Sequence, residues 1–133
     1  MDILMYIKLA AAAIGAGIGW ALGGVDAFLF ILTALVIIDY ISGVLAAATE
    51  KKLSSAVGLK GIAKKVMIFL LVAVGTMADK VLMPDAAMIR DAVMFFYIAN
   101  EAISITENAT RLGLPLPKKL TKVLEQLKNK EEA

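Results

Sequence analysis

The sequence predicts an all-α integral membrane protein with four transmembrane helices and a short cytoplasmic C-terminal helix. Of the 133 residues, 60% are hydrophobic, whereas a soluble domain is roughly half apolar. The apolar residues stand in long runs, such as the charge-free residues 9–25, rather than at amphipathic spacing. Lysines gather in a loop at 51–65 and in the C-terminal tail, a distribution typical of the cytoplasmic segments of a membrane protein.

Composition excludes several classes of function. The chain has no cysteine and no histidine, so it has no thiol nucleophile and lacks the commonest metal ligand and neutral-pH base. It also has no glycine-rich phosphate loop. We therefore expect no enzymatic activity, no cofactor and no metal. The formal net charge is only +2, which argues against nucleic acid as a partner.

Four apolar segments have the length of about 20 residues that a bilayer crossing requires. The fourth is the least apolar, because Arg90, Asp91 and Glu101 lie near its ends. It could instead be an interfacial helix, which would leave three spans. The first segment could be a cleaved signal peptide. The predicted spans are residues 3–22, 27–48, about 62–83 and about 86–105.

The lysines predict the orientation of these spans. The connection between the second and third spans carries five lysines against Glu50 alone, and the tail is also basic. Both should therefore be cytoplasmic, with the other two connections outside. We expect a transmembrane domain over residues 1–108 and a basic tail over 109–133. Residues 118–130 should form a basic helix that lies on the inner leaflet or packs on another copy, although a solvated tail is also compatible.

The first span carries glycines at four-residue spacing, namely Gly15, Gly19 and Gly23. Such a ridge lets two helix backbones approach closely. We expect a helix-packing role, within one chain or between copies. Similar ridges also arise by chance, because glycine and alanine are common in membrane helices.

The second span contains one carboxylate, Asp39, near its middle. A carboxylate in a bilayer faces a cavity, pairs with a base or is neutral. Gly43 lies one turn later on the same face, so this face can press against another helix. We expect Asp39 to control assembly or to line an aqueous lesion. A structural carboxylate bonded to Thr33, Ser42 or a neighbouring span is equally compatible.

The fourth span and its extension carry a polar stripe at helical spacing. A stripe of this kind suits a pore lining or an interface helix, although a solvated helix outside the membrane would show the same pattern. Glu107 and Arg111 form a predicted i,i+4 pair. Nothing in the sequence brings Glu101 and Asp39 together. The stripe comprises Asn100, Glu101, Ser104, Glu107, Asn108 and Arg111.

The loop after the second span predicts a helix break and restart. Ser54 or Ser55 can cap a short helix, and Gly58 and Gly61 allow tight turns. The lysines that follow can lie at anionic headgroups on the membrane rim. These predicted rim cations are Lys60, Lys64 and Lys65.

Two blocks of this sequence resemble the bacteriophage holins of the toxin-secretion and phage-lysis type, which include the clostridial toxin-export holins. They occur in the same order and spacing, and the similarity covers about residues 29–128. The first is Asp39-Tyr40-Ile41-Ser42-Gly43, followed by Leu53-Ser54-Ser55, Gly58, Gly61 and Lys64-Lys65. The second is Asn100-Glu101-Ala102-Ile103-Ser104-Ile105-Thr106-Glu107-Asn108, followed by Leu112-Gly113-Leu114-Pro115-Leu116-Pro117.

The resemblance implies a protein that accumulates in the bacterial cytoplasmic membrane, forms homo-oligomers and opens lesions at a set time. An endolysin or a toxin would pass through without specific binding, and an antiholin is a possible partner. We expect assembly or lumen roles for Asp39, Gly43, Glu101, Ser104, Glu107 and Asn108. Two other classes stay open: a small ion channel or transporter that uses Asp39 and Glu101 as a relay, and an antiholin that delays lysis.

Overall fold

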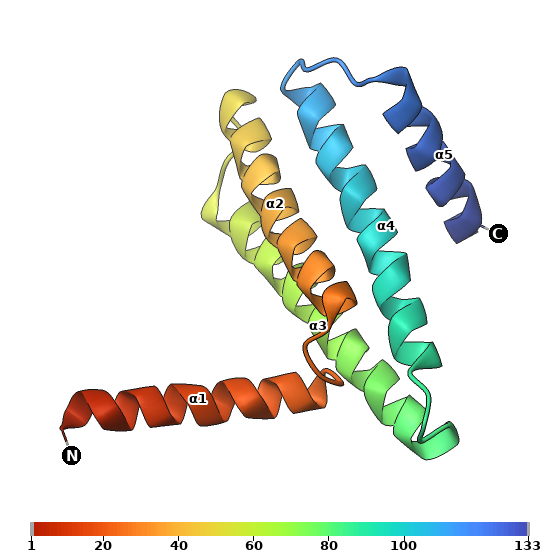
Figure 1. The fold of residues 1–133 in the computed structure, drawn as a ribbon. Helices are drawn as coiled ribbons and strands as arrows, with labels where there is room; N and C mark the ends of the chain where they lie inside the picture. The colour runs from red at the N-terminus through yellow and green to blue at the C-terminus, as the bar shows by residue number, and fades with distance from the viewer. Residues whose placement is uncertain (1, 133) are drawn as a thin grey trace.

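The computed structural model describes residues 2–132 and shows five α-helices, with no strand in this part of the chain. Helices α2 (Ala27–Thr49), α3 (Ser55–Leu82) and α4 (Met88–Arg111) form a three-helix bundle (Figure 1). Helix α1 (Ile3–Ala21) projects from one end of the bundle, and α5 (Lys118–Glu132) folds back beside α4. The predicted all-helical fold is confirmed.

Local side-chain caps explain where the helices begin. The Asp26 carboxylate accepts the Leu29 N–H at 2.9 Å before α2, and the Ser54 hydroxyl accepts the Val57 N–H at 3.2 Å before α3. Both caps satisfy a backbone donor that a helix start leaves unpaired. Gly113 takes φ +86° just after α4, the left-handed conformation with which many helices end.

The helix break and restart predicted after the second span is present, with Ser54 as the cap, but the predicted turns at Gly58 and Gly61 are wrong, because both glycines lie inside the continuous helix α3. They lie opposite Tyr40 of α2, at distances where an added Cβ would make ordinary contact. A Cβ at Gly58 would stand 3.4 Å from the Tyr40 hydroxyl oxygen, and one at Gly61 would stand 3.5 Å from its ring. Helix α3 therefore starts earlier than the third predicted span, and the true loop is confined to residues 50–54.

The apolar core occupies only the half of the bundle nearest α1. Beyond it, towards the α2–α3 loop, the interior is filled by buried alanines together with charged and amide side chains. Large apolar side chains such as Phe30, Ile41 and Leu70 are exposed on the outside. Helices α1 and α2 are long and apolar enough to cross a membrane by length and composition. The core consists of Leu29, Leu32, Val36, Ile68, Val72 and Met94.

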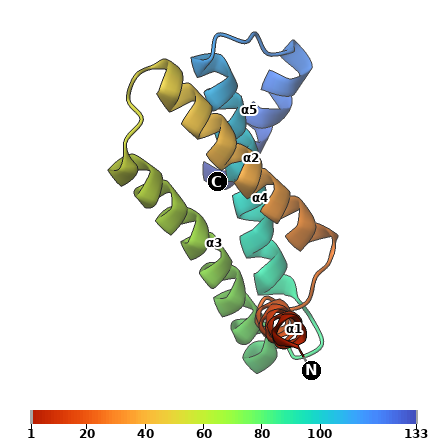
Figure 2. The same ribbon diagram turned by 90° about the vertical axis from the view of Figure 1, so that its left-hand side faces the viewer.

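Helix α1 buries no residue against the rest of the chain, and in Figure 2 it is seen end-on beside the foot of the bundle. A Cβ at Gly15 would meet no described heavy atom within 4 Å, and one at Gly19 would meet only Val25. Gly23 lies outside the helix, at φ +86° beside Arg90. Its predicted place on a helical ridge is therefore corrected to a turn.

The C-terminal basic helix predicted for residues 118–130 is present as α5. It packs on α4 and buries Leu124, which is 9% exposed. Leu120 and Val123 from the same predicted apolar face stay exposed. Helix α5 thus uses only part of its apolar face within one chain.

Candidate functional site

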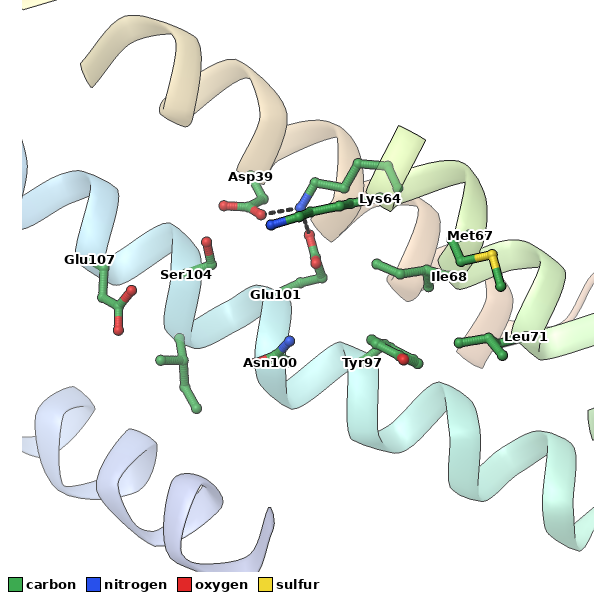
Figure 3. Close-up of a pocket in the computed structure, with 12 residues that line it drawn as sticks. Asp39, Lys64, Met67, Ile68, Leu71, Tyr97, Asn100, Glu101, Ser104 and Glu107 are labelled. Carbon is green, nitrogen blue, oxygen red and sulfur yellow. Dashed lines mark hydrogen bonds and ion pairs between the residues drawn. The ribbon is translucent and has the colours of Figure 1, made fainter. Parts of the chain in front are cut away.

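One charged side chain from each bundle helix meets at mid-height in the bundle interior. The Lys65 Nζ of α3 donates to Asp39 Oδ2 of α2 and, at 2.6 Å, to Glu101 Oε2 of α4. In Figure 3 the Asp39 and Glu101 side chains point towards one another, and dashed lines mark their ion pairs. Asp39 is 6% exposed and Glu101 is 3% exposed. We call these three residues the charge cluster.

Asn108 completes the hydrogen bonding of this cluster. Its Nδ2 donates to Asp39 Oδ1 and to the Ser42 hydroxyl, both at 2.9 Å. Such partners matter because a buried charge is strongly destabilising unless it is paired and hydrogen-bonded. Gly43 lies opposite this amide, and a Cβ there would stand 3.6 Å from the Asn108 Nδ2, an ordinary contact distance.

The structure therefore gathers four of the six predicted assembly or lumen residues: Asp39, Gly43, Glu101 and Asn108. Ser104 is half-buried and lines a groove next to the cluster. Glu107 is exposed on the rim of that groove. The structure thus brings Asp39 and Glu101 together, which the sequence alone did not do.

Lys65 requires a correction, because its ammonium points into the bundle rather than to the membrane rim. Consecutive residues of an α-helix point in directions about 100° apart, so Lys64 stays exposed while the Lys65 side chain is only 18% exposed. The sequence did contain a signal for this difference. Lys65 stands three and seven residues before Ile68 and Val72, which are core residues of the same helical face.

The predicted pair between Glu107 and Arg111 also requires a correction. The Arg111 Nε donates to Glu50 at 2.7 Å, and its Nη1 donates to Asn108 Oδ1 at 3.1 Å. Arg111 thus ties the end of α4 to the end of α2. The Arg111 guanidinium lowers the pKa of the Glu50 carboxyl below its ordinary value.

Two open grooves flank the charge cluster. One, of about 490 Å³, lies between α3 and α4 and includes Tyr97 and Glu107. The other, of about 540 Å³, lies between α2, α3 and the C-terminal part of α4, near the α2–α3 loop. It includes Lys60 and Arg111. Figure 2 shows α3 standing apart from α2 along this side of the bundle. Asp39 and Lys65 line both grooves, so the charge cluster lies between two partly polar spaces. The exposed Lys64 also lines both.

A second buried ionic site was missed at the other end of the bundle. Arg90 is 3% exposed and donates to the carbonyl oxygens of Leu22 at 2.6 Å and Gly24 at 2.8 Å. It also forms a 2.7 Å ion pair with Asp26. Arg90 thereby holds the α1–α2 connection against α4. Its partners are more than sixty residues away in sequence, so no local pattern marks them.

Asp79 fixes the backbone position of Arg90. The Asp79 carboxylate of α3 accepts the backbone N–H groups of Ile89 and Arg90 at 2.8 and 2.9 Å. These are otherwise unpaired donors at the start of α4, so Asp79 caps that helix from a neighbouring one. Gly75 allows the close approach, since a Cβ there would stand 3.1 Å from the Arg90 Cα.

The fold and the site define a helical protein whose interior carries ion pairs between its helices and whose helices α1 and α2 are long and apolar enough to cross a membrane. The chain belongs to the bacteriophage holin family, which matches residues 16–129. The resemblance expected from the two sequence blocks is thus confirmed.

Similar proteins occur in several bacteria. The chain is 39% identical over 130 residues to an "Uncharacterized 14.9 kDa protein in nagH 3'region" of Clostridium perfringens, with 98% of each chain covered. It is 43% identical over 129 residues to an uncharacterized protein of Halalkalibacterium halodurans, covering 94% of this chain and 96% of the relative. An uncharacterized protein of Listeria innocua is 42% identical over 124 residues, covering 93% and 86%. No solved structure matches the chain.

Proposed function

We propose that this chain is a holin that oligomerises in the bacterial cytoplasmic membrane and forms lesions for timed host lysis. An endolysin or a toxin would pass through these lesions without specific binding. Family membership supports the proposal. The observation that carries it is the charge cluster, which lies inside a bundle whose outer surface is apolar.

The cluster suits a protein that changes from separate subunits to an assembled lesion. In hydrocarbon every charged group must find a partner, and Lys65 supplies one to both Asp39 and Glu101 within a single chain. When many copies gather, the same groups can face water instead. The protein would therefore accumulate in the membrane with these charged groups paired inside each chain, and expose them to water only after assembly.

We infer four spans within residues 1–108 and a cytoplasmic tail over 109–133. The α2–α3 loop with Lys51 and Lys52 and the C-terminal end of α4 lie at the same end of the bundle (Figure 1), as the positive-inside rule requires of two cytoplasmic segments. Helix α4 packs against both α2 and α3, which supports counting it as a span rather than as an interfacial helix.

Expression of the chain in a bacterium tests this function. We expect abrupt loss of membrane potential after a delay, and lysis when an endolysin is co-expressed. Asp39→Ala and Gly43→Leu should shift the time of onset, because both change the packing of α2 on α4. Prolonged overproduction that leaves the membrane potential intact would contradict the proposal.

A small ion channel is the second candidate, and the two carboxylates that share one ammonium favour it as a possible ion path. Purified protein in vesicles separates the candidates. A holin should release protein-sized dextrans, whereas a channel should conduct small ions and retain the dextrans. A third outcome, delayed lysis when the chain is co-expressed with another holin, would indicate an antiholin.

A further inference from the structure

The groove that opens at the α2–α3 loop has an excess of positive charge. Its lining includes four cationic side chains but only one carboxylate, Asp39. Lys65 is engaged with Asp39 and Glu101, and Arg111 is engaged with Glu50. Lys60 and Lys64 are exposed and form no ion pair with any residue that the structure describes. Their ammonium groups are thus available to an anion.

A third groove, of about 250 Å³ and almost entirely apolar, lies between α2 and α3 and adjoins the cationic groove. Tyr40 and Lys65 line both grooves. The Tyr40 hydroxyl lies beside Gly58 and makes no hydrogen bond within the described residues. The two grooves therefore form a cationic space and an apolar space that meet at one tyrosine. The other apolar lining residues are Val36, Ile37, Ile41, Ile62, Val66 and Phe69.

We propose that the paired grooves bind one anionic phospholipid of the inner leaflet. Its phosphate would lie between Lys60 and Lys64, near Arg111, and an acyl chain would lie along the apolar groove. The proposal rests on the membrane orientation inferred above, which places these lysines on the cytoplasmic side. Basic pockets between membrane helices on that side are suited to anionic headgroups.

The combination of grooves selects a lipid over a soluble anion. A free phosphate would satisfy the lysines but would leave the apolar groove empty. An acyl chain, by contrast, would fill the apolar groove and contact its side chains. A zwitterionic lipid could fill the apolar groove, but its headgroup carries no net charge to meet the excess of lysine.

The chain offers a matched control for the test. Lys60→Gln/Lys64→Gln removes two charges from the groove, and Lys51→Gln/Lys52→Gln removes two from the adjoining loop, where both lysines are exposed and outside the groove lining. The full chain in detergent is mixed with phosphatidylglycerol or phosphatidylcholine, and retained lipid is counted by native mass spectrometry. Glycerol phosphate serves as the soluble competitor.

We expect selective retention of phosphatidylglycerol, reduced about tenfold or more by Lys60→Gln/Lys64→Gln and less than about twofold by Lys51→Gln/Lys52→Gln. An equal loss in both variants would overturn the site, because it would reflect general attraction to a basic surface. Displacement by glycerol phosphate as effective as by the lipid would overturn the lipid assignment. Failure to hold lipid in a chain that still releases dextrans would contradict this site alone.

Discussion

At the residue scale, one lysine forms ion pairs with two carboxylates inside the bundle. Lys65 is the cation of the described structure that contacts Asp39 and Glu101, and both carboxylates are almost fully buried. Removing one member of such a group leaves a buried charge without its partner, which is far more destabilising than the loss of a surface ion pair. Lys64, next in sequence but exposed, provides the comparison.

Lys65→Met should therefore lower the free energy of unfolding by about 3–5 kcal/mol, because two adjacent carboxylates lose their counter-ion. Lys64→Met should change it by less than about 1 kcal/mol. Unfolding of the detergent-solubilised protein, followed by circular dichroism, measures both. Adding Glu101→Gln to Lys65→Met should recover part of the loss. Equal effects of the two lysine variants would show that the cluster does not stabilise the bundle.

Asp26 makes a pH-dependent contribution at the α1–α2 connection. The Arg90 guanidinium, which bonds its carboxylate, holds the pKa of Asp26 below its ordinary value of 3.8. The folded state therefore binds fewer protons than the unfolded state, so the contribution is present above pH 3.8 and is lost as the pH falls through the folded pKa. The Asp26 side chain is 49% exposed, which keeps the effect small.

Asp26→Asn should accordingly flatten the acid limb of the stability curve, while leaving the shape of the curve above about pH 5 unchanged. Thermal unfolding across acidic pH, compared between wild type and variant, measures this. Asp85→Asn is the control, because Asp85 is exposed and forms no ion pair within the described chain. An acid limb that Asp85→Asn flattens equally would remove Asp26 from the explanation.

At the element scale, the glycines of the bundle differ in how closely a neighbouring helix approaches them. An added Cβ would make ordinary contact with Tyr40 at Gly58 and Gly61, but at Gly75 it would stand 3.1 Å from the Arg90 backbone of α4. Side chains can move to admit a methyl group, but the backbone of a packed helix cannot. The same residue type is therefore tolerant to substitution at some places in the bundle and intolerant at others.

Gly75→Ala should destabilise the bundle by about 1–3 kcal/mol, because its Cβ would press on the Arg90 backbone and force α3 and α4 apart. Gly15→Ala provides the comparison, since the new Cβ meets no described atom and alanine favours a helix. Chemical unfolding in detergent measures both variants. A Gly75→Ala protein as stable as wild type would contradict the close contact between α3 and α4.

At the scale of the whole molecule, α1 stands apart from a bundle that is complete without it. It buries no residue, and its contact with the bundle is limited to its end, where Lys80 of α3 lies 3.7 Å from the centre of the Trp20 ring. Helix association in membranes depends on close packing of small residues. The glycine ridge of α1 is therefore available to a second copy of the chain.

Gly15→Leu should weaken oligomer formation, because a large side chain on the ridge keeps two helix backbones apart. Gly17→Leu is the matched control: it also has open space around it within the chain but lies off the ridge. Cross-linking in membranes measures the oligomers, and circular dichroism checks that both variants fold. Equal oligomer formation by the two variants would mean that the ridge is not an interface between copies.

Much of the fold could be predicted because its causes are local. The lengths of the apolar runs set the helices, and Asp26 and Ser54 accept N–H groups only three residues away. The prediction of turns at Gly58 and Gly61 was wrong, since glycine permits a turn but is also tolerated inside a helix that tertiary packing stabilises. The role of Arg90 could not be predicted, because its partners lie in a turn more than sixty residues away in sequence.

The amino-acid sequence predicts an all-helical chain that resembles the holins, with most of its lysines in the loop at 51–65 and in the C-terminal tail. Which charges meet depends on how the helices pack. Lys65 is 26 residues from Asp39 and 36 from Glu101, and their contact depends on how three helices are rotated about their own axes. That rotation follows from burial of the core residues next to each charge, which are Val36, Ile68 and others of the same faces. This packing places Lys65, predicted at the membrane rim, beside two buried carboxylates.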